Sequence, residues 1–224
     1  MLYLGNPCSP SVVDAMRDGR LGLIDTPKQG SKAAKDSLHD SDVVWCADNG
    51  CFSEKWDEAE WWAFLQRNAH RASSCLFAVA PDVVGDAFAT TIRFRKWGQR
   101  IRDLGYPVAY VAQDGLEGLR GRTESGALTF PVPWGSFDCL FIGGSTTWKL
   151  GPECRSIVAE AKTRGKWVHM GRVNSEKRYR YAHAIGCDSV DGTKLVFGPD
   201  MNLPQVIAWS RSADQGAFDL GAFK

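Results

Sequence analysis

The sequence lacks several features that would each assign it to a particular class of protein. Its 224 residues contain no secretory signal and no apolar run of about 18 residues, so neither secretion nor a membrane-spanning helix is expected. They also contain no Pro/Gly/Ser-rich linker and no abrupt change of composition, which predicts a single domain over residues 1–224. We therefore expect a soluble cytoplasmic protein.

Paired cysteines and a nucleotide-binding glycine motif are also missing. The seven cysteines are scattered, and none forms the CxxC or CxC pair of a structural zinc site. Most of them are expected to be small core residues with reduced thiols. No GxGxxG follows the first apolar run, which leaves a dinucleotide cofactor weakly supported. The sequence thus predicts neither a bound metal nor another cofactor.

The sequence also lacks an excess of charge of one sign. Lys and Arg number 27 against 26 for Asp and Glu, so the formal net charge is +1. A general basic surface for nucleic acid is therefore not expected. Basic side chains do gather in two helical segments, around residues 93–102 and 177–180. These segments are either local nucleic-acid patches or ordinary solvated helix faces, and the sequence leaves both interpretations open.

What the sequence does contain is a regular alternation of short apolar runs with helical segments. One run, residues 75–82, is almost entirely apolar, which is typical of a strand buried on both faces. The eight predicted strands are residues 2–5, 21–25, 43–48, 75–82, 108–113, 139–144, 167–171 and 188–191. Such alternation predicts an α/β protein with a parallel sheet, and eight units predict a compact (β/α)8 TIM barrel. A doubly wound open sheet is the alternative.

Helices are predicted after most of these strands. The helical segments are residues 9–19, 31–40, 57–71, 86–104, 152–164, 175–186 and 204–212. In residues 57–71, the side chains of Trp61, Phe64 and Leu65 fall on one face, and Asp57 is a suitable N-cap. Residues 116–134 are the exception, because their Gly and Pro content predicts only a short helix or an open loop.

Polar side chains and glycines occupy the ends of the predicted strands. They are Asn6, Asp25, Asp48, Asp82, Gln113, Gly143–Gly144, Gly171–Arg172 and Asp191. In a barrel these residues would gather at one end, where several carboxylates raise one another's electrostatic cost and are best explained by a ligand. No His, Cys or Lys dominates the set, so a Ser/His triad, a Schiff base or a thiol nucleophile fits badly. Paired carboxylates suit substitution at a sugar anomeric carbon.

Asp191 is the strongest candidate for the reactive carboxylate. In the segment DSVDG, strand alternation places Asp188 on one side and Ser189 with Asp191 on the other. Asp191 also comes last, directly before Gly192, which is a typical catalytic position in a barrel. The alternative is that Asp191 makes a turn or caps the next helix.

Six short motifs, taken in order along the chain, carry a resemblance to a known family. They are ADNGCF, the strand ending at Asp82, VAQDG, FIGG, HMGRVN and GCDSVDG. Together they resemble the tRNA-guanine transglycosylase superfamily, and within it the small phage-type 7-deazaguanine DNA transglycosylases (DpdA-like). The resemblance covers about residues 25–194, and it implies a barrel enzyme that exchanges guanine for a 7-deazaguanine such as preQ0.

The resemblance also implies a role for individual residues. Asp191 would attack C1′ of the nucleotide and form a covalent glycosyl-enzyme, while Asp48 would act as the general acid/base. Asp82 would accept hydrogen bonds from the base. The remaining candidates from the resemblance are Gln113, Gly143 and Gly144 around the base O6, and Phe52 and Met170 stacked on the base. Separately, Lys149, Arg172 and Lys194 are candidates for nucleic-acid contacts, although Lys149, in the loop after FIGG, could equally cover the barrel mouth.

Two departures from the family pattern favour its DNA-modifying branch. The tRNA enzymes carry a CxCxxC…H zinc site in an insertion that helps to hold tRNA, whereas no Cys or His follows Asp191 here. Asn49 and Cys51 replace the usual Ser and Gly of the first motif. The resemblance thus implies guanine-containing DNA and a free 7-deazaguanine base as partners, no membrane, a possible homodimer, and host-cell cytoplasm if a phage encodes the chain.

Other functions remain open at this point. The chain could be closer to the tRNA enzymes, or it could be a glycosidase or nucleosidase barrel with a small closed pocket. It could also be a non-catalytic barrel that binds nucleic acid or a partner enzyme. Among the candidates, Phe52 and Met170 could be plain core residues, and Gly143–Gly144 a tight turn. His169, beside Met170, is expected to be a structural histidine with its hydrogen bonds satisfied.

Overall fold

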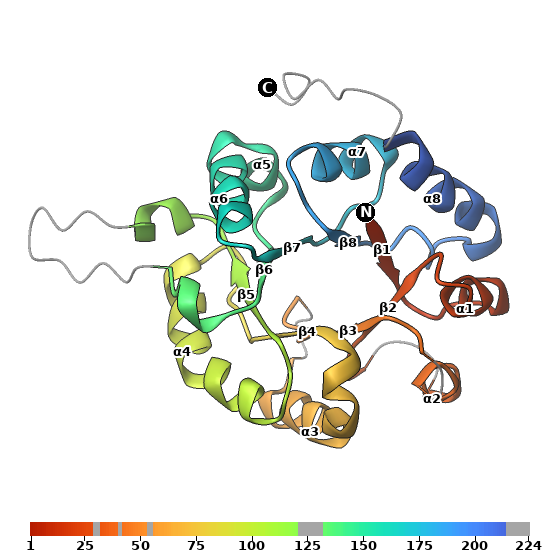
Figure 1. Cartoon of the computed structure of the whole chain (residues 1–224), viewed down its shortest axis with the longest axis horizontal. Helices are drawn as coiled ribbons and strands as arrows, with labels where there is room; N and C mark the ends of the chain where they lie inside the picture. Colours follow the sequence, from red (N-terminus) through yellow and green to blue (C-terminus); the bar gives the residue numbers. More distant parts are fainter. Residues whose placement is uncertain (29–31, 40–41, 53–55, 121–131, 214–224) are drawn as a thin grey trace, which may run out of the picture.

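The computed structural model describes residues 1–28, 32–39, 42–52, 56–120 and 132–213, and it is a closed barrel of eight parallel strands surrounded by helices (Figure 1). Each strand pairs with the next along the chain, and β8 pairs with β1 to close the barrel. The strands are β1 (Leu2–Gly5), β2 (Gly22–Asp25), β3 (Trp45–Ala47), β4 (Cys75–Val79), β5 (Val108–Ala112), β6 (Cys139–Ile142), β7 (Trp167–Met170) and β8 (Ser189–Asp191). The predicted (β/α)8 barrel is confirmed, and the open sheet is excluded.

Helices cover the outside of the barrel. They are α1 (Pro10–Arg17), α2 (Lys32–His39), α3 (Glu58–Asn68), α4 (Ala87–Asp103), α5 (Thr146–Leu150), α6 (Pro152–Thr163), α7 (Glu176–Ala184) and α8 (Pro199–Ala213). Three short 3₁₀ segments complete the described structure: η1 (Ala69–Ser74), η2 (Leu116–Arg120) and η3 (Trp134–Ser136). The absence of an α-helix after β5 agrees with the prediction for residues 116–120 and 132–134, whereas residues 121–131 lie outside the described part.

Local sequence explains where the helices begin and which face they bury. Asp57 caps α3, since its Oδ1 accepts a hydrogen bond from the Glu60 backbone N–H at 2.7 Å. Trp61, Phe64 and Leu65 form the buried face of this helix, as their spacing predicts. Two differences from the sequence prediction concern other helices. The short helix α5 was not predicted, and α8 begins at Pro199 and not near residue 204.

The strands separate two apolar layers. One layer fills the barrel and includes Leu4, Cys46, Phe77 and Val111, while the larger layer lies between the strands and the helices. Side chains alternate along each strand between the inside and the outside of the barrel. When the last side chain of a strand points inward, it lies at the C-terminal mouth of the barrel. This alternation decides which strand-end side chains can form a common site.

Two further observations concern the cysteines and the helices. All seven cysteines lie in the described part and are free thiols. None of the described helices is long and apolar enough to cross a lipid bilayer.

Candidate functional site at the barrel mouth

A pocket of about 170 Å³ opens at the C-terminal ends of the strands. Of the eleven residues proposed from the sequence as catalytic, base-binding or nucleic-acid-binding, seven line it: Asp48, Phe52, Asp82, Gln113, Gly143, Arg172 and Asp191. They come from the ends of six strands or the loops that follow, so only the closed barrel brings them together. This end of a barrel is where catalytic residues are ordinarily found.

Asp191 is held in place by a buried histidine. His169 Nε2 lies 3.0 Å from Asp191 Oδ1, and His169 Nδ1 lies 2.8 Å from Ser189 Oγ. The Trp167 indole N–H donates to the same Ser189 Oγ at 2.9 Å. All partners are satisfied when Ser189 donates to Nδ1 and Nε2–H donates to Asp191. His169 therefore fixes Oδ1 of Asp191 and makes no hydrogen bond to Oδ2.

Asp48 is a carboxyl group with an unusual proton affinity. Burial, together with the negative charge of Asp191, raises the pKa of Asp48 to about 7. The Gly50 backbone N–H, 3.1 Å from Asp48 Oδ2, opposes this rise in pKa by favouring the charged form. Near neutral pH, Asp48 can therefore either give or take a proton.

Asp82 is a third carboxylate, and two side-chain amides hold it. Asn49 Nδ2 donates to Asp82 Oδ1 at 2.8 Å, and Gln113 Nε2 donates to Asp82 Oδ2 at 2.6 Å. Burial nevertheless raises the pKa of Asp82 above its ordinary value. Gln113 is oriented in turn by the Gly85 N–H, which donates to its Oε1 at 3.0 Å. Cys51 also hydrogen-bonds this carboxylate. A carboxylate has about four acceptor positions, so Asp82 keeps acceptor capacity for one donor of a ligand.

Arg172 connects the glycine turn with the rim of the pocket. Its guanidinium donates to the carbonyl oxygens of Gly143 and Gly144, and it lies 4.9 Å from the ring centroid of Phe52. Arg172 also has a φ of 62°, a left-handed conformation that is uncommon outside glycine. Phe52 is 69% exposed, so the pocket has an aromatic rim with a cation stacked on it.

The structure does not give Gly144 the role that the sequence suggested. The N–H groups of Gly143 and Gly144 both donate to the Ala112 carbonyl, at 2.9 and 3.2 Å. The Gly144 N–H is therefore committed within the turn and not free to bond a base O6. Gly143 does line the pocket, where close packing explains the residue type. A Cβ there would lie 2.7 Å from Gln113 Nε2.

Met170 lies outside the pocket, which corrects its expected stacking role. It is 2% exposed and belongs to the apolar layer between the strands and the helices. The reason is alternation along β7, because His169 points into the barrel and its neighbour Met170 points out. Phe141 of β6 supplies an aromatic ring to the pocket in its place.

The two proposed lysines are not at the pocket either. Lys149, at the end of α5, is 4% exposed and donates to the Gly171 carbonyl at 2.6 Å. Burial and the nearby Arg172 lower the pKa of Lys149 to about 8. Its ammonium thus stabilises the turn after β7 and is not placed to contact a nucleic acid. Lys194 is half-buried and lies 5.8 Å from the ring centroid of Trp209 in α8.

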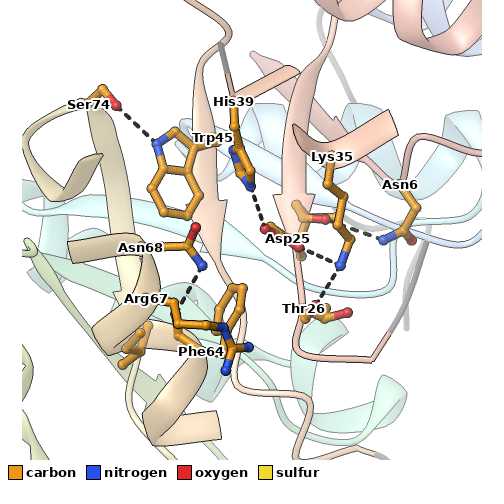
Figure 2. Close-up of polar contacts among 12 residues, drawn as sticks. Asn6, Asp25, Thr26, Lys35, His39, Trp45, Phe64, Arg67, Asn68 and Ser74 are labelled. Atoms are coloured by element: carbon orange, nitrogen blue, oxygen red, sulfur yellow. Dashed lines mark hydrogen bonds and ion pairs between the residues drawn. The ribbon is translucent and has the colours of Figure 1, made fainter. Parts of the chain in front are cut away.

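Asp25 also fails to join the other strand-end carboxylates. Its Oδ1 lies 2.6 Å from Lys35 Nζ and its Oδ2 lies 2.9 Å from His39 Nε2, both in α2 (Figure 2). Alternation again explains the difference, because Ile24 lines the pocket and the next residue points toward the helices. The side chain of Asp25 therefore connects β2 to α2. Without it, the pocket contains three carboxyl groups.

Sequence reasoning missed the residues that position the carboxylates. His169 and Asn49 were not proposed as functional, yet they contact Asp191 and Asp82 directly. For His169 a signal was present. Ser189 and Asp191 were expected on one face of their strand, and β7 pairs with β8 so that His169 lies opposite Ser189. No comparable signal identified Asn49.

Metal binding has no support in this geometry. Among the described residues, no group of three or more His, Cys, Asp or Glu side chains is arranged to hold a metal ion. The chemistry available in the pocket is that of a held carboxylate beside a carboxyl group with a pKa near 7, which suits nucleophilic substitution with proton transfer.

Comparisons with known proteins do not assign the chain to a family. No protein-family model matches the sequence, and no curated protein matches it with statistical significance. The resemblance to the transglycosylases therefore rests on the six sequence motifs alone.

Proposed function

We propose that the protein exchanges guanine in DNA for a free 7-deazaguanine base, through a covalent intermediate on Asp191. The observation that carries the proposal is the pairing, in one pocket, of a carboxylate held by His169 with a carboxyl group whose pKa is about 7. Acyl or phosphoryl transfer would need a different set of groups, whereas two carboxyls suit substitution at an anomeric carbon.

The first half of the reaction removes the original base. The free oxygen of Asp191 attacks C1′, the C1′–N9 bond breaks, and protonated Asp48 gives its proton to the departing guanine. His169 keeps Asp191 in a fixed orientation, which lowers the entropic cost of the attack. The products of this half-reaction are free guanine and a deoxyribosyl ester of Asp191.

The second half restores a nucleoside. The incoming 7-deazaguanine loses its N9 proton to Asp48 and attacks C1′, and the ester bond to Asp191 breaks. Asp82 supports recognition in both halves, because its remaining acceptor capacity suits an N–H donor such as the N1–H of a guanine-like base. No nucleotide triphosphate or metal is needed, since the glycosidic bond is exchanged and not formed anew.

The decisive experiment uses a labelled oligonucleotide that contains an unpaired guanine. We expect wild-type protein to form an adduct that survives a denaturing gel when no incoming base is present, and to incorporate a 7-deazaguanine when one is added. Asp191→Asn should abolish both adduct and exchange, because an amide is a far poorer nucleophile. Asp48→Asn should slow exchange by about 10²- to 10⁴-fold, the usual effect of removing a general acid/base.

Asp188→Asn is the matched control. Asp188 lies just before β8, and its carboxylate contacts Lys162 at 2.7 Å, away from the pocket. This variant should keep wild-type exchange. An adduct that persists in Asp191→Asn would contradict the assignment of the nucleophile, and release of free guanine without incorporation would indicate a nucleosidase instead.

A further inference from the structure

A larger cavity of about 680 Å³ lies outside the barrel, between α2 and α3. One wall carries the network in which Asp25 contacts Lys35 and His39, and the opposite wall carries Arg67 and Asn68 of α3 (Figure 2). We call this cavity the α2–α3 groove. None of these residues is used by the proposed chemistry, so the groove needs a separate explanation.

The groove is more basic than the chain as a whole. Four cationic side chains line it, namely Lys28, Lys35, Arg67 and Arg71, against the two carboxylates Asp25 and Asp36. The lining thus has a formal charge of +2, and the neighbouring Glu60, which pairs with Lys28, brings the local total to +1 on this small surface. Asp25 is 1% exposed and paired with Lys35, so its charge is compensated within the protein. A local excess of positive charge favours an anionic ligand.

The cations at the surface of the groove can reach such a ligand. Arg67 is exposed, and Lys28 Nζ contacts Glu60 at 2.8 Å in an ion pair whose side chains are 47% and 40% exposed. Exposed ion pairs of this kind contribute little stability, so a phosphate can compete with Glu60 for Lys28. Lys28 and Arg67 therefore mark the two ends of a path along α3.

The groove and the reaction pocket are linked by shared lining residues. A third cavity lies between them, and it shares Thr26, Pro27 and Lys28 with the groove. The same third cavity shares Asp48 and Phe52 with the reaction pocket. The three cavities are therefore neighbours, and a ligand long enough to cross the third cavity, which Asp48, Asp57 and Glu60 also line, reaches the groove at Lys28.

Two aromatic rings line the third cavity, and Phe52 also lines the reaction pocket. Phe52 is 69% exposed, and the half-buried Trp56 lines the third cavity. Trp56 is oriented by its indole N–H, which donates to the Asn49 carbonyl at 3.0 Å. Aromatic rings beside a basic groove are the pattern of single-strand nucleic-acid sites, where bases stack and phosphates lie among cations.

We propose that the α2–α3 groove binds the phosphate backbone of the single DNA strand whose guanine enters the reaction pocket. This inference rests on the proposed function, which supplies the strand. A base must leave the double helix before its C1′ can be attacked, so the enzyme meets a locally single strand. That strand passes the rings of Phe52 and Trp56, and its next phosphates lie beside Lys28 and Arg67.

Binding of an oligothymidylate tests the inference without any base exchange, because the probe contains no guanine. A labelled probe of about 15 nucleotides is near the upper end of single-strand site sizes. We expect Lys28→Ala and Arg67→Ala each to weaken binding about 3- to 10-fold at low salt, and to reduce the salt dependence by about 0.7 per lost phosphate contact. Arg67→Lys should retain most of the affinity.

Arg20→Ala is the control, because Arg20 is an exposed arginine at the opposite end of the barrel, in the turn before β2. It should bind the probe as the wild type does. Equal affinities for the wild type and both groove variants, or an equal loss in Arg20→Ala, would overturn the inference. Base exchange is measured in a separate assay. Failure of the proposal for the groove and failure of the proposed function therefore give different results.

Discussion

At the scale of single residues, Asp48 links the chemistry of the pocket to the stability of the protein. Its pKa is raised from 3.8 to about 7 in the folded chain, so the native state binds a proton that the unfolded state releases between these values. The stability associated with the neutral carboxyl is thus fully present below about pH 4 and is lost as the pH rises through about 7.

Chemical denaturation at several pH values measures this effect. We expect the free energy of unfolding to fall on the order of 1–3 kcal/mol between about pH 4 and pH 8 through this group alone. Asp48→Asn should remove this part of the pH dependence, because the amide does not titrate. Asp191→Asn should shift this part of the pH dependence to lower pH, since the charge of Asp191 contributes to the raised pKa of Asp48.

Asp188→Asn again serves as the comparison, because Asp188 is not among the groups that raise the pKa of Asp48. A pH profile that is unchanged in Asp48→Asn would show that the carboxyl titrates normally. In that case Asp48 would be ionised at neutral pH and could act only as a base.

At the scale of elements, the loops after β7 and β8 form one structure around Asp191. The Val173 N–H donates to the Asp191 carbonyl at 2.6 Å, and the Thr193 N–H donates to Asn174 Oδ1 at 2.7 Å. Gly192 lies between these two bonds. A Cβ on Gly192 would lie 2.5 Å from the Val173 carbonyl oxygen and closer still to Asn174 Oδ1.

Gly192→Ala should therefore separate the two loops. We expect it to cost about 1–3 kcal/mol of stability, the range for overpacking at a crowded position, and to reduce adduct formation by displacing Asp191. Thermal unfolding and the denaturing-gel assay measure the two effects. Gly135→Ala is the control, because nothing lies within 4 Å of a Cβ there, and it should change neither quantity.

The elements also show what the sequence can predict and what it cannot. Alternation of apolar runs with helices is a property of many residues at once, and it predicts the barrel and its mouth. Whether one strand-end side chain points into or out of the barrel depends on which alternate residues of the strand face inward. When all residues of a strand are apolar, the sequence does not show which ones these are. Met170 and Asp25 were misplaced for this reason, since their strands are buried on both faces. The five residues of α5 are too few to show a helical period.

At the scale of the whole molecule, closure makes every strand depend on its neighbours. Leu4 illustrates this, because it is fully buried inside the barrel, and its strand pairs with both β2 and β8. A barrel of this kind has no free edge strand that could separate first. The protein should therefore unfold as one cooperative unit.

Leu4→Ala tests this expectation. We expect it to lower the free energy of unfolding by about 2–5 kcal/mol, as large-to-small changes do in packed cores. Far-ultraviolet circular dichroism and tryptophan fluorescence should report the same transition before and after the change. Met201→Ala, at a side chain that is 75% exposed, should leave the transition in place. Two separate transitions in the wild type would show independent parts instead.

The position of the start of β1 has a practical consequence for attaching the protein to a surface or to a fusion partner. The Leu2 N–H donates to the Asp188 carbonyl at 3.1 Å, and the Tyr179 hydroxyl bonds the Met1 carbonyl, so the first residues are fixed against β8 and α7. Because parallel strands all begin at the same end, Met1 lies at the opposite end of the barrel from the reaction pocket. A tether or fluorescent fusion joined ahead of Met1 would leave from the barrel floor, and the immobilised protein would keep its mouth turned toward the solution.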